Sequence, residues 1–240
     1  MSAMLRFLGG VYLKKVIVDT RISKKCESAL ISLGHTVIKL PPDPVLPPPV
    51  ASHPDMLLFL YRDKLITHKD YYSIAKNELE RIGKEIILTD EPIGNKYPND
   101  ILFNALHLGE HLIGKMEFVS DKIKALPLKQ LNINQGYAKC SSCIVSESAL
   151  ITSDPSVEAA AKKLGVDVLV ISHGHIALAG YDTGFIGGAS GVCDDLVTFC
   201  GNIDLHPDAE AIKIFCESHG KKAISLSDEP LYDLGTLFFI

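Results

Sequence analysis

The chain repeats part of its own sequence, and this repetition constrains its fold more than any other feature. The run LTDEPIG at 88–94, followed by NDILF at 99–103, recurs as LSDEPLY at 226–232, followed by GTLFF at 235–239. In both copies an apolar strand runs into an acidic turn, and a second apolar strand follows a short loop. Because such internal repeats mark one supersecondary unit used several times, we expect an architecture of repeated units.

The repeated unit is predicted to contain two strands, a helix and a third strand. In the clearest copy, strands at 56–61 and 65–67 precede a helix at 71–82, which Gly83 ends, and a strand at 84–88. Further copies run over 101–134, 143–171 and 185–226. The first copy, at 15–40, lacks a first strand, which residues 237–240 can supply. The sequence therefore predicts one α/β domain over 1–240, a five-bladed propeller of ββαβ units with pseudo-fivefold symmetry, closed by the C-terminal strand.

The composition argues against several classes of protein. Hydrophobic residues make up 47% of the 240 positions and charged residues 22%, as in a globular protein with a core. The net charge of −5, with dispersed Lys and Arg, argues against nucleic-acid binding. No apolar run reaches the ~20 residues that span a bilayer, and residues 1–15 show no signal-peptide pattern. The six cysteines lack a disulfide-framework spacing, so we expect free thiols in the cytoplasm.

Five such units around one axis resemble the pentein fold. This fold is shared by arginine deiminases, dimethylargininase-type hydrolases and amidinotransferases, which modify guanidino groups, and by a non-enzymatic translation initiation factor. With SHPD at 52–55 and GYDTGFIGG at 180–188, the chain looks most like an uncharacterised bacterial branch. The resemblance implies a Cys nucleophile, a His and carboxylates that hold the guanidinium. The chain departs from that pattern: residues 231–240 contain no Cys, and Pro98-Asn99-Asp100 replaces the usual acidic loop.

Aligning the units on their second strands predicts which residues share a cavity. Asp55 then falls opposite Cys140, Asp100 lies at the entry of its own unit, and Asp182 lies just before the entry of the unit at 185–226. Because unit entries approach the axis of a propeller, we expect these four residues to converge. Carboxylates suit a cation such as guanidinium, which forms bidentate hydrogen bonds with them, and a Cys thiolate could attack its carbon. The alternative is that the Asp residues only cap strand starts.

Two other features lie beside the predicted cavity. His53 is either an acid/base at the cavity mouth or a solvated turn residue. The glycine-rich stretch at 180–191 contains Tyr181, Gly187 and Gly188, and it matches neither a P-loop nor a dinucleotide fingerprint. Its small residues either let the backbone approach a ligand or form a tight hairpin near a crowded axis.

The remaining cysteines and histidines give weaker signals. Cys140 and Cys143 form one Cys-x-x-Cys pair that leads into a strand, and no second pair completes a zinc site. Cys26 and Cys216 lie among apolar helix positions and are interpreted as core. The sequence therefore predicts no metal and no cofactor.

These observations predict a protein that binds a small cationic, guanidino-like or amino-acid-like molecule in an axial cavity. If it is a hydrolase or amidinotransferase, Cys140 is the nucleophile, His53 moves protons, and Asp55 orients the ligand. The other expected ligand contacts are Asn99, Asp100, Tyr181, Asp182, Gly187 and Gly188. The alternative is a non-catalytic protein of the same fold that serves as a sensor or binds a macromolecule. The oligomeric state stays open.

Overall fold

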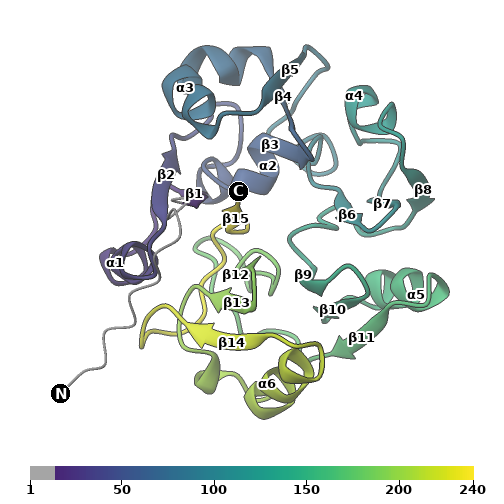
Figure 1. The fold of residues 1–240 in the computed structure, drawn as a ribbon. Coiled ribbons are helices and arrows are strands. Elements are labelled where there is room, and N and C mark those ends of the chain that lie inside the picture. The colour runs from purple at the N-terminus through teal and green to yellow at the C-terminus, as the bar shows by residue number, and fades with distance from the viewer. Residues whose placement is uncertain (1–13) are drawn as a thin grey trace.

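The computed structural model describes residues 14–240, which fold into five small sheets and six α-helices. The residues before 14, where no signal peptide is expected, lie outside the described part. Figure 1 shows the five sheets arranged around a common centre, with most helices on the outside. None of the helices in residues 14–240 is long and apolar enough to cross a membrane.

Each sheet contains three strands. The sheets are β15 (Phe238–Phe239), β1 (Lys15–Asp19) and β2 (Thr36–Leu40); β3 (Leu58–Tyr61), β4 (Lys64–His68) and β5 (Glu85–Thr89); β6 (Leu106–Leu108), β7 (His111–Gly114) and β8 (Lys129–Asn132); β9 (Cys143–Ser146), β10 (Ala149–Thr152) and β11 (Asp167–Val170); and β12 (Ser190–Cys193), β13 (Leu196–Phe199) and β14 (Lys222–Ser225). The helices are α1 (Lys24–Ser32), α2 (Pro54–Leu57), α3 (Lys69–Ile82), α4 (Asp121–Lys124), α5 (Pro155–Lys163) and α6 (Ala209–Ser218), with 3₁₀ turns at Pro48–Val50 and Ile203–Leu205.

All five sheets share one topology. The first two strands of each sheet are antiparallel, the second and third are parallel, and a helix connects the parallel pair. In the first sheet the antiparallel partner of β1 is β15, with Val16 opposite Phe239. The C-terminal residues therefore supply the strand that the first unit lacks.

The connecting helices follow sequence signals. In α3, Tyr71, Ala75, Leu79 and Ile82 recur at helical spacing and are buried, and Gly83 ends the helix in the left-handed conformation with φ 82°. In α5, the side chain of Asp154 caps the first turn by accepting from two backbone N–H groups.

One expected strand differs from the structure. Residues 54–57 form the short helix α2, and the predicted strand at 56–61 is limited to β3. Pro54 at the first helical position favours this turn, because its fixed φ suits a helix start. The helix matters for the site, because it turns Asp55 toward the middle of the molecule.

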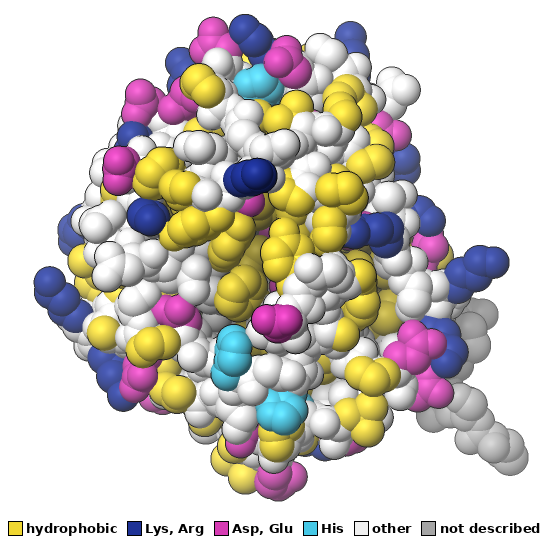
Figure 2. Space-filling model, turned by 180° about the vertical axis from the view of Figure 1, so that it is seen from behind, with side chains coloured by type: hydrophobic (Ala, Val, Ile, Leu, Met, Phe, Trp, Pro, Cys, Tyr) yellow, Lys and Arg dark blue, Asp and Glu magenta, His cyan; other side chains and the backbone are white. Residues whose placement is uncertain are grey.

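The middle strands of the sheets form much of the core. In β10 every residue is buried, and in β1 and β4 only the first residue is not. Such near-continuous burial is expected of strands that are covered on both faces of the sheet. On the face shown in Figure 2, hydrophobic side chains gather in the middle with a few charged side chains among them, and most charged side chains of both signs lie around the edge.

Candidate functional site

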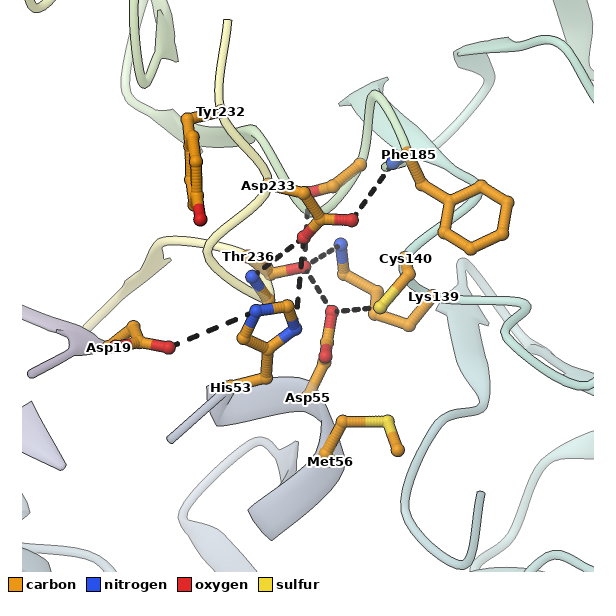
Figure 3. A network of polar contacts seen from close by, with 12 residues as sticks. Asp19, His53, Asp55, Met56, Lys139, Cys140, Phe185, Tyr232, Asp233 and Thr236 are labelled. Carbon is orange, nitrogen blue, oxygen red and sulfur yellow. Dashed lines mark hydrogen bonds and ion pairs between the residues drawn. The ribbon is translucent and has the colours of Figure 1, made fainter. Parts of the chain in front are cut away.

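The five loops that enter the first strands meet at the centre. Asp55, Cys140 and Gly187 lie three positions before β3, β9 and β12, and Asn104 and Thr236 lie two positions before β6 and β15. Hydrogen bonds link these residues, and we call them, together with His53 and Lys139, the central cluster. Figure 3 shows its members His53, Asp55, Lys139, Cys140 and Thr236. The equivalent position in each unit thus delivers a group to one place.

Asp55 is the main acceptor of the central cluster. Its Oδ2 accepts hydrogen bonds from Cys140 Sγ at 2.9 Å and from Thr236 Oγ1 at 2.8 Å. Its Oδ1 is buried and has no hydrogen-bond partner within the described residues. Burial raises the pKa of Asp55, whereas the nearby charge of Lys139 opposes the rise. One carboxylate oxygen therefore stays free for another group.

Asn104 positions the thiol of Cys140. Its Oδ1 accepts from the backbone N–H groups of Lys139 at 3.0 Å and Cys140 at 3.2 Å, and its Nδ2 lies 3.1 Å from Cys140 Sγ. Burial and the adjacent Asp55 raise the pKa of Cys140 well above its ordinary value near 9. The thiol is therefore protonated in the protein without a ligand.

The C-terminal segment contributes a hydroxyl group to this centre. Thr236 Oγ1 accepts from Lys139 Nζ at 3.1 Å and lies 3.0 Å from the carbonyl oxygen of Gly187. Thr236 has φ 73°, a left-handed conformation that is strained for a β-branched residue. Burial lowers the pKa of Lys139, although Asp55 opposes this. Backbone strain such as that of Thr236 is common at functional sites.

His53 is buried without a hydrogen-bond partner among the described residues. Only 1% of it is exposed, and neither ring nitrogen is paired. Its Nε2 lies 3.8 Å from an oxygen of Asp19, and its Nδ1 lies 3.8 Å from an oxygen of Asp233. Burial, aided by the charge of Arg21, lowers the pKa of His53 to about 3, so the ring is neutral at neutral pH. Buried polar groups normally form hydrogen bonds, so the unpaired ring of His53 indicates a place where another group can bind.

Two carboxylates that flank His53 are held from different sides. Asp19 accepts from the backbone N–H of Arg21 at 2.7 Å and from its guanidinium. Asp233 accepts from the backbone N–H groups of Phe185 and Gly235, each at 2.9 Å. Burial and the charge of Asp55 raise the pKa of Asp233 to about 7.

The structure brings together only some of the residues expected from the sequence. His53, Asp55 and Cys140 lie in the central cluster. Asp100 is buried nearby, where its Oδ2 accepts from Tyr137 at 2.9 Å and its Oδ1 has no partner within the described residues.

Three of the expected ligand contacts lie at the surface. Asn99, Tyr181 and Asp182 are exposed, and Tyr181 is 46% exposed. Asp182 therefore does not converge with Asp55, because the chain becomes continuously buried only from Ile186 onward. A carboxylate that precedes this point keeps its solvation.

The two central glycines are explained by crowding. A Cβ on Gly188 would lie 2.7 Å from Oδ2 of Asp233 and still closer to Oδ1. A Cβ on Gly187 would meet the backbone carbonyls of Lys139 and Ser142. Of the two readings of the glycine-rich stretch, close packing at the centre accounts for these positions.

Sequence reasoning missed Asp19, Asn104, Asp233 and Thr236. Aligning the last segment with the first unit would have found Thr236, because it precedes β15 much as Asp55 precedes β3. Asn104 occupies the same place before β6, where Asp100 was expected. No local pattern marks Asp19 or Asp233, which approach His53 from distant parts of the chain.

A cavity of about 410 Å³ lies beside this centre. Arg21 lines this cavity and its guanidinium donates to Asp19. Asp19 in turn lies next to His53, so these contacts connect the cavity wall to His53. Cys26 and Cys200 line the cavity as well, so Cys26 is at a cavity wall in addition to packing in the core. A hydrogen bond with Cys200 lowers the pKa of Cys26 to about 6.

Comparison with solved structures identifies the fold. An amidinotransferase of saxitoxin biosynthesis from Microseira wollei matches with a TM-score of 0.55 and 11% identity, over 90% of this chain and 89% of that one. A dimethylarginine dimethylaminohydrolase from Pseudomonas aeruginosa, in complex with citrulline, matches with 0.53 and 10%, over 90% and 92%. An agmatine deiminase from C. jejuni matches with 0.54 and 9%, over 90% and 88%. The expected resemblance to the pentein fold is therefore confirmed.

The family assignment is more specific than the fold. A family model described as "Family of unknown function (DUF6873)" matches residues 17–238, and the chain belongs to this family. No curated protein matches its sequence.

Proposed function

We propose that the five units form a closed five-bladed propeller whose central cluster binds a small cationic, guanidino-like or amino-acid-like molecule. The pairing of β15 with β1 and the arrangement of the sheets support the closure. The likeness to an amidinotransferase, a dimethylarginine hydrolase and an agmatine deiminase supports the class of ligand.

The unpartnered acceptors of the central cluster carry this proposal. Asp19 is already bound by Arg21, and Asp233 accepts two backbone N–H groups. Asp55 Oδ1 and the one acceptor nitrogen of the neutral His53 ring remain without partners among the described residues. A guanidinium or amidinium group presents several N–H donors in one plane, and carboxylate acceptors bind such a plane strongly.

The same contacts support a covalent reaction at Cys140. The Sγ–H group points to Asp55 at 2.9 Å, so Asp55 can take its proton, and a bound cation lowers the pKa of the thiol. The thiolate then forms a C–S bond with the central guanidinium carbon. Asp55 passes this proton to the leaving nitrogen, the C–N bond breaks, and an amine is released. Water next adds to the carbon and gives one proton to Asp55. The C–S bond then breaks, the sulfur takes that proton from Asp55, and a urea-type product leaves after its remaining hydroxyl proton passes to solvent.

A thermal-shift panel of guanidines, amidines and amino acids tests the ligand. A ligand at a hundredfold excess over its Kd stabilises the folded state by about 2.7 kcal/mol, which raises the melting temperature of a chain this size by roughly 5–10 °C. Asp55→Asn should abolish the shift. Asp182→Asn, the same change at an exposed carboxylate, should keep it. Equal shifts in both variants, or no shift with any cation, would contradict the proposal.

A non-catalytic version of this function is the second candidate. The C-terminal segment contributes Thr236 to the centre, and the thiol of Cys140 is protonated at rest. Incubation of a stabilising ligand with the wild type, followed by mass spectrometry of the small molecule, separates the two candidates. A urea-type product that Cys140→Ser does not form supports catalysis, whereas an unchanged ligand supports binding alone.

A further inference from the structure

We propose that His53, Asp55 and Cys140 also form a binding site for a divalent transition-metal ion, with Zn²⁺ as the representative ion. We further propose that this ion and the cationic ligand exclude each other. The second part rests on the proposed function, and the first does not.

The geometry of the three side chains suits such an ion. Each offers one ligand atom, and these atoms all lie within 4.8 Å of one another. Ligands at 2.0–2.3 Å around a tetrahedral zinc ion are about 3.3–3.8 Å apart, so only a small contraction is needed. All three residues are buried. Helix α2, with His53 at its N-cap, and the segment before β9 hold them there.

The ligand atoms are largely available. Within residues 14–240, no hydrogen-bond partner contacts either ring nitrogen of His53. Oδ1 of Asp55 has no partner there either. Only the contact of Cys140 Sγ with Asp55 must be given up, and the thiol proton is released when the metal–sulfur bond forms. A metal ion thus accounts for several buried polar atoms that are otherwise unsatisfied.

Neighbouring groups support the same three ligands. Whichever nitrogen of His53 binds the metal, the other faces a carboxylate at 3.8 Å, of Asp19 or Asp233. A carboxylate behind a ligating His fixes its orientation and raises its basicity. The amide Nδ2 of Asn104, 3.1 Å from Cys140 Sγ, can donate to a metal-bound thiolate.

The donor set determines the class of metal. One sulfur, one nitrogen and one carboxylate oxygen are borderline donors that suit Zn²⁺, whereas Mg²⁺ and Ca²⁺ require oxygen ligands. The thiolate and the carboxylate neutralise the dication. Because a guanidinium would use the same Asp55 oxygen, the two cations compete for one place.

Cobalt substitution gives the most specific test. The wild type, stripped with a chelator, should bind about one equivalent of Zn²⁺ in equilibrium dialysis and show a thiolate-to-cobalt absorption band with Co²⁺. Cys140→Ser should lose the band, and Cys143→Ser, at a buried cysteine outside the cluster, should keep it. His53→Gln provides a second test in case Cys140→Ser fails to fold. Less than about a tenth of an equivalent of metal, or an equal band in Cys140→Ser, would overturn the metal site.

Competition separates this inference from the proposed function. Saturation with Zn²⁺ should abolish the thermal shift caused by a guanidine, and a guanidine should reduce Co²⁺ binding at least tenfold. Both ligands bound together without mutual effect would overturn the exclusion. Metal binding without any guanidine shift would overturn only the proposed function, and a guanidine shift without metal binding would overturn only the metal site.

Discussion

Replacing Gly188 with alanine should destabilise the protein through Asp233. The φ of Gly188 is not in the left-handed region, so alanine is compatible with its backbone. The added methyl group would lie 2.7 Å from Oδ2 of Asp233 and closer still to Oδ1. Asp233 is fully buried, so its carboxylate cannot swing into solvent. The carboxylate must therefore leave its two backbone donors, the N–H groups of Phe185 and Gly235.

The expected loss combines two effects. Overpacking a close-packed interior costs about 1–3 kcal/mol. Hydrogen-bond donors that become buried and unsatisfied cost about 1–3 kcal/mol more. We therefore expect the free energy of unfolding in urea to fall by roughly 2–6 kcal/mol and the melting temperature by roughly 5–20 °C.

Two further variants show whether the loss arises from Asp233. Gly220→Ala, at φ 69° with no atom within 4 Å of the new Cβ, should cost only about 1 kcal/mol of backbone strain. Asp233→Ala removes the atoms that the methyl group meets. The double variant should then lose about 1–3 kcal/mol less free energy of unfolding than the two single losses added together. A Gly188→Ala loss below about 0.5 kcal/mol, or strict additivity, would refute the reasoning.

Three other predictions concern charge and reactivity. Iodoacetamide at neutral pH should modify Cys26, whose pKa is lowered to about 6 at a cavity wall, before Cys140, whose pKa is raised; peptide mass spectrometry showing the opposite order would contradict this. Folding raises the pKa of Asp233 from 3.8 to about 7, so its contribution to stability is present below pH 4 and is lost as the pH rises to 7. Asp233→Asn should therefore flatten the dependence of the free energy of unfolding in urea on pH between pH 4 and 7. Arg21→Met should cost about 2–3 kcal/mol, because Asp19 is left buried without its charged donor, and a loss within 0.5 kcal/mol would count against it.

The repeat in the sequence predicted the order of helices and strands, because this order depends on local signals. These signals are the spacing of apolar residues and the residues that end each element. Apolar runs and helix-ending glycines are visible in each unit, as at Gly83. Equivalent positions of repeated units meet at a common centre, so the alignment placed Asp55 opposite Cys140, and the two lie in contact.

The rest of the site depends on contacts between distant segments. Thr236 meets Asp55 across 181 positions of sequence, and no local pattern records that pairing. Asp182 looked equivalent to Asp55, but its loop stays at the surface before the chain enters the centre. The first unit is assembled from both ends of the described chain, so its entry at Thr236 is found only when residues 237–240 are aligned with the first strands of the other units.

A crystal structure of the protein soaked with methylguanidine tests the central claim most directly. We expect the planar cation to lie in the central cluster, with its N–H groups on Asp55 Oδ1 and its carbon next to Cys140 Sγ. Methylguanidine bound only at surface carboxylates, or Asp55 and Cys140 pointing away from each other, would contradict the account.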